Sequence, residues 1–224
     1  MQVEEGGVAA LSPAAQDYLR AIYALEHAGS AVTTSALAER MQVSAPSATA
    51  MAKRLAGLGL VARAPYRGLS LTEAGSRAAV ELLRHHRLLE RFLHDRLGFP
   101  LDEVHAEADR LEHALSERLE ARIDAELGFP THDPHGGPIP DAGLNLGPAN
   151  HRTLSDLTAG EGGRVRTVPD EDAGLLRYLA SLGLVPGAEV ALAAAAPFGG
   201  PLTLRTAAGE HAVARELAAR VGIA

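Results

Sequence analysis

The chain has 224 residues, of which 46% are hydrophobic, and its formal net charge at pH 7 is −7. This length allows two or three small domains with cores of their own. The lack of cysteine excludes disulfides and thiolate metal sites. We find neither a signal peptide nor an apolar run of transmembrane length, so we expect a cytoplasmic protein with no membrane partner.

The first predicted helix begins at Ser12-Pro13, with serine as N-cap and proline in the first turn, and runs to about His27. Two shorter helices follow, Thr34–Met41 and about Ala45–Leu58. Ser44 is a suitable N-cap for the second of these. Two short helices joined by a tight turn are typical of a helix-turn-helix.

A β-hairpin is predicted directly after these helices. Leu60–Ala64 alternates in polarity, Pro65–Gly68 forms a turn, and Leu69–Leu71 returns. Arg67 lies at the tip of this hairpin. A helix-turn-helix followed by such a wing indicates a winged-helix domain.

Charge distribution favours DNA as the partner of this winged helix. Residues 33–77 contain six basic and two acidic side chains, a net charge of +4 within an acidic chain. Small polar side chains at the start of the third helix can reach bases or phosphates, and the cations can bind phosphate. A winged helix used only for protein contacts is the alternative. The predicted DNA-binding residues are Ser44, Pro46, Ser47, Thr49, Lys53, Arg54 and Arg67.

Two amphipathic helices are predicted between Ala78 and Glu126, with a break at Leu97–Pro100. The first carries two potential metal ligands four residues apart. The second carries four, at spacings that place them within an arc of about 100° on one helix face. Charged residues at helical spacing also form solvated faces, but two such helices in succession favour a metal site. The residues are His86 and Glu90, then His105, Asp109, Glu112 and His113.

Proline and glycine crowd residues 128–150, which we predict to be a linker. Because a lone histidine in a linker is usually exposed to solvent, His132 and His135 are not assigned as ligands.

The segment 151–224 reads as short strands punctuated by glycine, which predicts a small β-barrel. The expected strands are Arg164–Val168, Glu189–Ala195, Leu202–Thr206 and a short one after Glu210, with a helix at Asp172–Leu182. This segment carries no recognisable catalytic motif.

Several strings spread over nearly the whole chain resemble the DtxR/MntR family of iron- and manganese-dependent repressors. The metal-helix strings are specific, whereas a winged helix alone would not be. The strings are Asp17-Tyr18-Leu19, Ala38-Glu39-Arg40, Ser44-x-Pro46-Ser47, Arg67-Gly68-Leu69, His86-Arg87-Leu88-Leu89-Glu90, Val104-His105-x-x-Ala108-Asp109, Glu112-His113 and His135-Gly136-Gly137-Pro138-Ile139-Pro140.

The resemblance implies two neighbouring metal positions. One would use His86, Glu90 and His105, and the other would use Asp17 with Asp109, Glu112 and His113. Iron-responsive members have Met and Cys where this chain has Asp17 and Asp109, whereas manganese-responsive members have carboxylates there. Mn²⁺ is therefore the expected cofactor, with Fe²⁺ as the alternative. The resemblance also implies an acidic ligand from the last domain, here Glu171 or Asp172.

The expected fold class is α+β. A winged-helix domain (1–75) precedes a helical metal-binding and dimerisation domain (76–127), a linker (128–150) and an SH3-like, FeoA-like domain (151–224). The expected function is a homodimeric repressor of metal-uptake genes that binds double-stranded DNA when loaded with metal. The alternatives are a metal-dependent hydrolase, since a histidine and carboxylate pair of helices can hold a hydrolytic metal, and a regulator that senses an organic ligand.

Overall fold

The computed structural model describes residues 8–29, 31–64, 68–147, 152–170 and 172–224. Two predicted site residues, Arg67 and Glu171, lie outside these ranges. The chain divides into two compact units: residues 1–86, 111–120 and 140–145 form the first, and 87–110, 121–139 and 146–224 form the second. No described helix is both long and apolar enough to cross a membrane.

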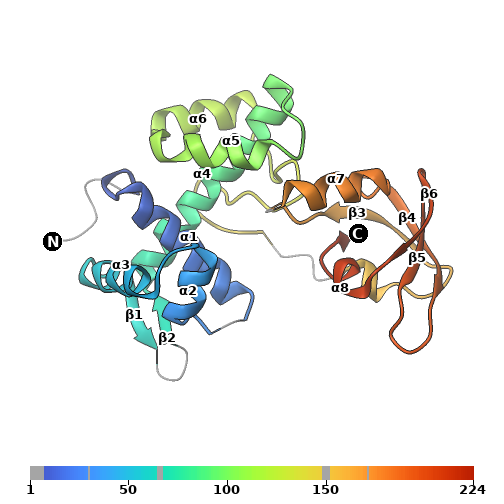
Figure 1. Cartoon of the computed structure of the whole chain (residues 1–224). Helices are drawn as coiled ribbons and strands as arrows, with labels where there is room; N and C mark the ends of the chain where they lie inside the picture. The colour runs from blue at the N-terminus through green and yellow to red at the C-terminus, as the bar shows by residue number, and fades with distance from the viewer. Residues whose placement is uncertain (1–7, 30, 65–67, 148–151, 171) are drawn as a thin grey trace. The chain divides into compact units, whose positions relative to one another are not determined.

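The first unit contains the predicted helix-turn-helix. A 3₁₀ turn at Val8–Ala10 leads to α1 (Pro13–His27), α2 (Thr34–Arg40) and α3 (Ala45–Gly57) (Figure 1). The hydroxyl of Thr33 accepts a hydrogen bond from Ala36 N at 3.0 Å and so caps α2. The three helices share a core whose fully buried side chains include Leu19, Ile22, Leu37 and Leu55.

The predicted wing is present as β1 (Val61–Ala64) and β2 (Gly68–Leu71), an antiparallel pair in the register Val61 to Leu71. Gly68 has a φ of +83°, and a Cβ there would lie 2.5 Å from the carbonyl oxygen of Val32. Only glycine fits this close approach, through which the wing pairs with Val32, ahead of α2.

The long helix α4 (Glu73–Leu97) follows the wing, and the predicted break at Leu97–Pro100 is present. The prediction of one continuous helix after that break is wrong. The chain forms α5 (Val104–Leu111), a 3₁₀ turn η3 (Glu112–Ala114) and α6 (Glu117–Glu126). Leu115, which is buried, is extended with a ψ of 121°, so the helical ladder is interrupted between η3 and α6.

The second unit contains the C-terminal sheet, which is antiparallel with strand order β6-β5-β4-β3-β7. Its elements are η4 (Leu154–Asp156), β3 (Gly162–Thr167), α7 (Ala173–Ser181), β4 (Glu189–Ala195), β5 (Leu202–Thr206), β6 (Gly209–Val213), α8 (Arg215–Ala218) and β7 (Gly222–Ile223). Alternate residues such as Leu202 and Leu204 face one core, as the period-2 pattern predicts.

Within the predicted linker, the segment 131–139 is folded onto this unit. Its backbone joins β3, since Val168 N donates to the carbonyl oxygen of His135 at 3.0 Å. Gly136 has a φ of +89°, and a Cβ there would lie 1.8 Å from the carbonyl oxygen of Arg166. The expected exposure of His135 is therefore wrong: the residue is 1% exposed, because a local Gly-Gly turn lets the chain approach the strand closely.

Candidate metal centres

The first unit brings three predicted ligands together. Ligand atoms of Asp17, on α1, and of Glu112 and His113, in η3, lie within 4.8 Å of one another. His113 Nε2 is 3.2 Å from Asp17 Oδ1. Two carboxylates and an imidazole in this arrangement suit a divalent first-row cation. We call these three residues the α1 cluster.

Neighbouring groups fix the orientation of the His113 ring. Gln16, which is buried, donates its amide N–H to the carbonyl oxygens of Val8 (2.9 Å) and Leu11 (3.2 Å), so its amide oxygen faces the ring. His113 Nδ1 donates to that oxygen at 2.8 Å. The neutral ring then presents the Nε2 lone pair to Asp17, an arrangement that needs a proton or a cation between them.

Glu112 is held by two further side chains of the same unit. Arg20 Nη1 lies 2.5 and 2.6 Å from its two oxygens, and His86 Nδ1 lies 2.7 Å from Oε2. Burial raises the pKa of the Glu112 carboxyl, but the hydrogen bond from His86 and the charges of Arg20 and His86 outweigh it and hold that pKa below its usual range. The carboxylate is thus ionised and ready to bind a cation that displaces Arg20.

The second unit contains a larger set of donors, which we call the α4 cluster: Glu90, His105, Asp133, His135 and Asp170. Ligand atoms of Glu90, Asp133 and His135 form one group within 4.8 Å, and those of Glu90, His105 and Asp170 form another. Glu90 Oε1 lies 3.0 Å from His105 Nδ1, and Oε2 lies 3.7 Å from His135 Nδ1. Glu90, on α4, is common to both groups and is fully buried.

His135 is oriented as a metal-ligating histidine would be. Its Nε2 donates to the carbonyl oxygen of Leu101 at 2.9 Å, which leaves the Nδ1 lone pair facing Glu90. Within the described residues Nδ1 makes no hydrogen bond, although it is buried. A buried acceptor aimed at a carboxylate is stabilised by a proton or a cation, so the geometry fits a metal position.

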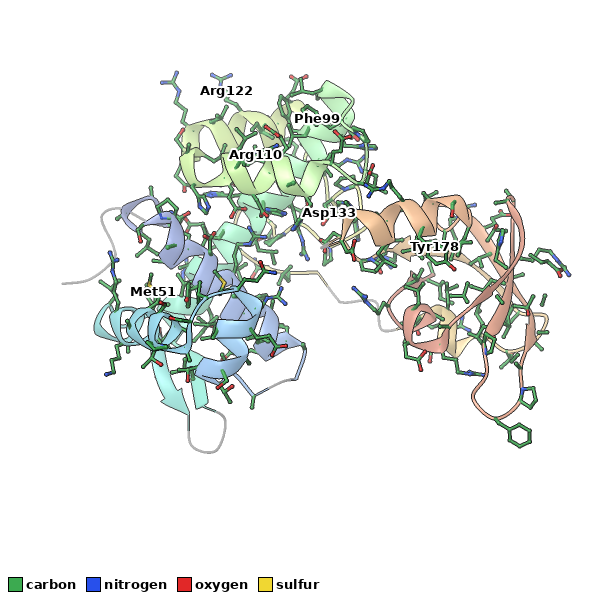
Figure 2. The ribbon with its side chains drawn as sticks, in the orientation of Figure 1. Met51, Phe99, Arg110, Arg122, Asp133 and Tyr178 are labelled. Carbon is green, nitrogen blue, oxygen red and sulfur yellow. The ribbon has the colours of Figure 1, made fainter. Side chains whose placement is uncertain are left out.

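Asp133 reaches the same position from the folded segment 131–139, beside α7 (Figure 2). Its Oδ1 accepts from the backbone N–H groups of His135 (2.8 Å) and Gly137 (2.9 Å), and its Oδ2 lies 3.2 Å from Arg87 Nε. Burial and the negative charge of Glu90 raise the pKa of Asp133 to about 6. Burial lowers the pKa of His135, but the carboxylate of Glu90, 3.7 Å from Nδ1, outweighs it, so that pKa is raised. Both shifts reflect the negative charge gathered at this position.

Of the acidic residues before α7, the structure brings Asp170, and not the predicted Asp172, close to other donors, while Glu171 lies outside the described residues. Asp170 lies with Glu90 and His105, whereas Asp172 is the N-cap of α7. Asp172 Oδ1 accepts from the backbone N–H groups of Gly174 (2.8 Å) and Leu175 (3.1 Å). N-capping explains why an aspartate stands at that position.

Asp133, His135 and Asp170 were missed by sequence reasoning. The spacing Asp133-x-His135 before Gly136-Gly137 could have indicated two ligands on one turn. The surrounding proline and glycine residues indicated a linker instead. Of the other predicted ligands, Asp109 lies on α5 with Oδ2 3.7 Å from His105 Nε2. His86 contacts Glu112, as described above.

The predicted DNA-reading side chains lie on an exposed face of α3. Ser44 caps the helix, accepting from Ser47 N at 3.3 Å, and the two hydroxyls lie 2.8 Å apart. Thr49 donates its hydroxyl to the carbonyl oxygen of Ala45 at 2.8 Å. Pro46, Ser47, Lys53 and Arg54 are exposed. The hydroxyls of Ser44, Ser47 and Thr49 thus all make hydrogen bonds within the helix, and Ser47 is exposed.

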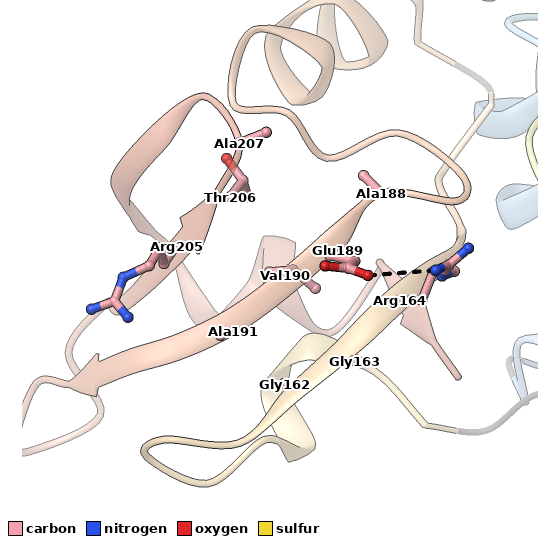
Figure 3. Close-up of a pocket in the computed structure, with 10 residues that line it drawn as sticks. All are labelled: Gly162, Gly163, Arg164, Ala188, Glu189, Val190, Ala191, Arg205, Thr206 and Ala207. Carbon is pink, nitrogen blue, oxygen red and sulfur yellow. Dashed lines mark ion pairs between the residues drawn. The ribbon is translucent and has the colours of Figure 1, made fainter.

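An open hollow of about 800 Å³ lies on the C-terminal sheet, between β3, β4 and the β5–β6 turn (Figure 3). Glycines and alanines make up much of its lining, and Arg164 pairs with Glu189 at 3.5 Å. None of the lining residues belongs to either metal cluster.

Comparison with known proteins agrees with this architecture. Residues 10–69 match the family "Iron dependent repressor, N-terminal DNA binding domain", residues 72–141 match "Iron dependent repressor, metal binding and dimerisation domain", and residues 152–224 match the FeoA domain. The iron-dependent repressor IdeR of Mycobacterium tuberculosis is 40% identical over 185 residues, which cover 77% of this chain and 80% of that protein.

Solved structures of manganese regulators are also similar. A manganese-dependent transcriptional repressor in complex with manganese superposes with a TM-score of 0.84 at 39% identity, covering 93% of this chain and 98% of the other. The manganese regulator SloR superposes with a TM-score of 0.80 at 34% identity, covering 96% and 99%. From the sequence identity, the three matching domains and the fold, we conclude that this chain belongs to the DtxR/MntR family of iron- and manganese-dependent transcriptional repressors.

Proposed function

We propose that this protein is a metal-activated repressor that binds operator DNA as a homodimer in the cytoplasm and controls metal-uptake genes. The observation that carries the proposal is the α1 cluster. Asp17 lies on the first helix of the DNA-binding domain, and its carboxylate meets Glu112 and His113 from η3. A cation held there would join the two segments, so the arrangement of the DNA-reading helices would depend on metal.

The donors of the α1 cluster account for the proposed switch. Asp17, Glu112 and His113 would hold the ion, and the ion would supply positive charge. Without it, the two carboxylates repel each other and Arg20 takes up part of the charge of Glu112. Ligation favours one arrangement of the reading heads in a dimer that spans two half-sites. By linkage, DNA raises the metal affinity by the same factor.

The α4 cluster would hold a second ion. Glu90 and His105 were expected as ligands from the sequence, and Asp133, His135 and Asp170 join them in the structure. Three carboxylates and two imidazoles again suit a hard or borderline dication. An ion there would tie α4 to the segment 131–139 and to the residues before α7.

Mn²⁺ is the proposed activating ion. No described ligand in either cluster is a thioether, and the chain has no thiol. Hard oxygen donors suit Mn²⁺, while sulfur donors favour softer ions. The test is the double substitution Asp17→Met, Asp109→Cys, with DNA affinity titrated against free Mn²⁺ and Fe²⁺ without oxygen. The response should move toward Fe²⁺, and an unchanged preference for Mn²⁺ would assign the selectivity to other residues.

The proposed DNA contacts are those of α3 and the wing. Changing Lys53 or Arg54 to alanine should weaken binding to all sequences and reduce the salt slope by about 1 for each lost phosphate contact. Changing Ser47 to alanine should alter sequence preference instead, because its hydroxyl is exposed on α3 and can turn from Ser44 to base edges.

The deciding experiment is DNA binding with and without metal. A randomised duplex pool is selected in Mn²⁺, and the affinity of the selected duplex is measured in Mn²⁺ and in chelator. Equal affinity in both would overturn the proposal. The two rival functions make different predictions: a hydrolase would turn over a substrate in Mn²⁺, and a sensor of an organic ligand would bind DNA independently of metal.

A further inference from the structure

A third group of donors lies in the first unit, apart from both clusters. Glu81 and His85 stand one turn apart on α4, and Glu117 is the first residue of α6. Their ligand atoms lie within 4.8 Å of one another. The group thus joins two helices through one imidazole and two carboxylates, a donor set that suits Zn²⁺ and Mn²⁺.

His85 gives the first independent indication of a ligand. The residue is 1% exposed, and its Nε2 makes no hydrogen bond among the described residues. Glu120 Oε2 lies 2.8 Å from this nitrogen, at ion-pair distance, and Glu117 Oε1 lies 3.8 Å away. A buried ring nitrogen that faces carboxylates without a hydrogen bond is costly unless it is occupied.

The charges of the group give the second indication. Glu120 already has a buried partner, since its Oε1 lies 2.5 Å from Arg84 Nε. Arg84 therefore compensates Glu120, and the carboxylates of Glu81 and Glu117 remain together beside a histidine. Burial and the charge of Glu117 raise the pKa of Glu81, as expected for two carboxylates that share one position.

We propose that Glu81, His85 and Glu117 form a third divalent-cation site, which fastens the first turn of α6 to α4. The site goes beyond the proposed repressor function and does not depend on it. Glu81 and Glu117 supply negative charge, the imidazole supplies a nitrogen donor, and Glu117, which is 78% exposed in its side chain, leaves the site open to the solvent. An ion there would exchange readily with ions in solution and would stabilise the start of α6.

The test measures metal stoichiometry in the full chain by equilibrium dialysis against Zn²⁺, with bound metal determined by mass spectrometry. Glu117→Gln removes one carboxylate from an exposed position and should not affect folding. It should lower the number of bound ions by one per chain, or weaken one binding step by at least about tenfold. Glu73→Gln is the matched control, because it removes the same charge from an exposed residue of α4 outside the group.

The same titration in an Asp17→Asn, Glu90→Gln background separates this proposal from the proposed function. With the α1 and α4 clusters impaired, one ion per chain should remain, and its binding should disappear on adding Glu117→Gln. His85→Gln should have the same effect if circular dichroism shows that it folds. If Glu117→Gln binds as many ions as Glu73→Gln in both backgrounds, the third site does not exist, whatever the result of the DNA-binding experiment.

Discussion

The α1 and α4 clusters handle negative charge in different ways. In the α1 cluster, Arg20 and His86 hold Glu112, and the side chains of Asp17 and His113 are 41% and 20% exposed. In the α4 cluster, Glu90, Asp133 and His135 are all at least 98% buried. The first therefore has an internal counter-ion and access to solvent, which suits a sensor that exchanges its ion. The second buries two carboxylates and an imidazole, with Arg87 beside Asp133, and an added positive charge would stabilise it further, which suits a tightly held ion.

Removing the ion from the α4 cluster should have the largest effect. Because buried carboxylates bind the ion only in the folded state, free Mn²⁺ at 100 times its dissociation constant should stabilise the fold by about 2.7 kcal/mol. For a chain of this size the thermal midpoint should rise by roughly 5 to 10 °C. Glu90→Gln should abolish most of that rise, as measured by scanning calorimetry with and without Mn²⁺. An equal rise in the variant would contradict the proposed role of this cluster.

Asp17→Asn should distinguish the proposed role of the α1 cluster in DNA binding from that of the α4 cluster in stability. Loss of one carboxylate from α1 should raise the Mn²⁺ concentration needed for half-maximal DNA binding by at least about tenfold, since a ligand is lost at the proposed switch. The metal-dependent rise in thermal midpoint should remain, because it comes mainly from the α4 cluster. Fluorescence anisotropy of a labelled duplex gives the first quantity. If Asp17→Asn lost the metal-dependent rise in thermal midpoint but kept metal-dependent DNA binding, the roles of the two clusters would be the reverse of those proposed.

Mildly acid pH should lower the affinity of the α4 cluster for metal. The pKa of Asp133 is raised to about 6 and that of His135 is raised, so both hold protons at mildly acid pH when metal is absent. A raised carboxyl pKa means that protonation favours the folded state below about pH 6. Metal must displace these protons, and its affinity should fall by up to about tenfold per pH unit for each proton displaced.

Calorimetric titration of Mn²⁺ at pH 6 in two buffers of different ionisation enthalpy measures the proton release directly. Asp133→Asn should remove part of it, whereas Asp17→Asn should leave it unchanged. Identical heats in the two buffers for the parent chain would show that the α4 cluster does not bind metal in exchange for protons.

Arg20→Ala should have the smallest effect, and in the opposite direction. Arg20 binds both oxygens of Glu112, so it would compete with the ion. Its removal should tighten metal binding at the α1 cluster by about threefold to tenfold, at most roughly 1.4 kcal/mol. The measurement is the Mn²⁺ concentration at half-maximal DNA binding. Weaker binding in the variant would show instead that Arg20 positions Glu112 for the ion.

Local patterns in the sequence were sufficient for the first three helices, the wing and α4. Capping residues such as Thr33 and Ser44 set where α2 and α3 begin, and period-2 alternation marks the strands. Histidine and carboxylate spacing on α4 and α5 identified Glu90 and His105, which lie 3.0 Å apart in the structure. These features depend on neighbours a few residues away, and the sequence contains them.

Contacts between distant segments decided the rest. The composition of residues 128–150 indicates a linker, yet Gly136 brings Asp133 and His135 onto β3 and toward Glu90. The tertiary structure likewise places Asp170 with Glu90 and His105 and leaves Asp172 as a helix cap, a choice that two aspartates separated by one residue do not reveal. The sequence by itself determined most of the elements, the family resemblance and five of the eight residues in the two clusters. Only the fold determined which donors meet, because a metal cluster requires side chains from separate segments to be fixed within a few ångströms of one another.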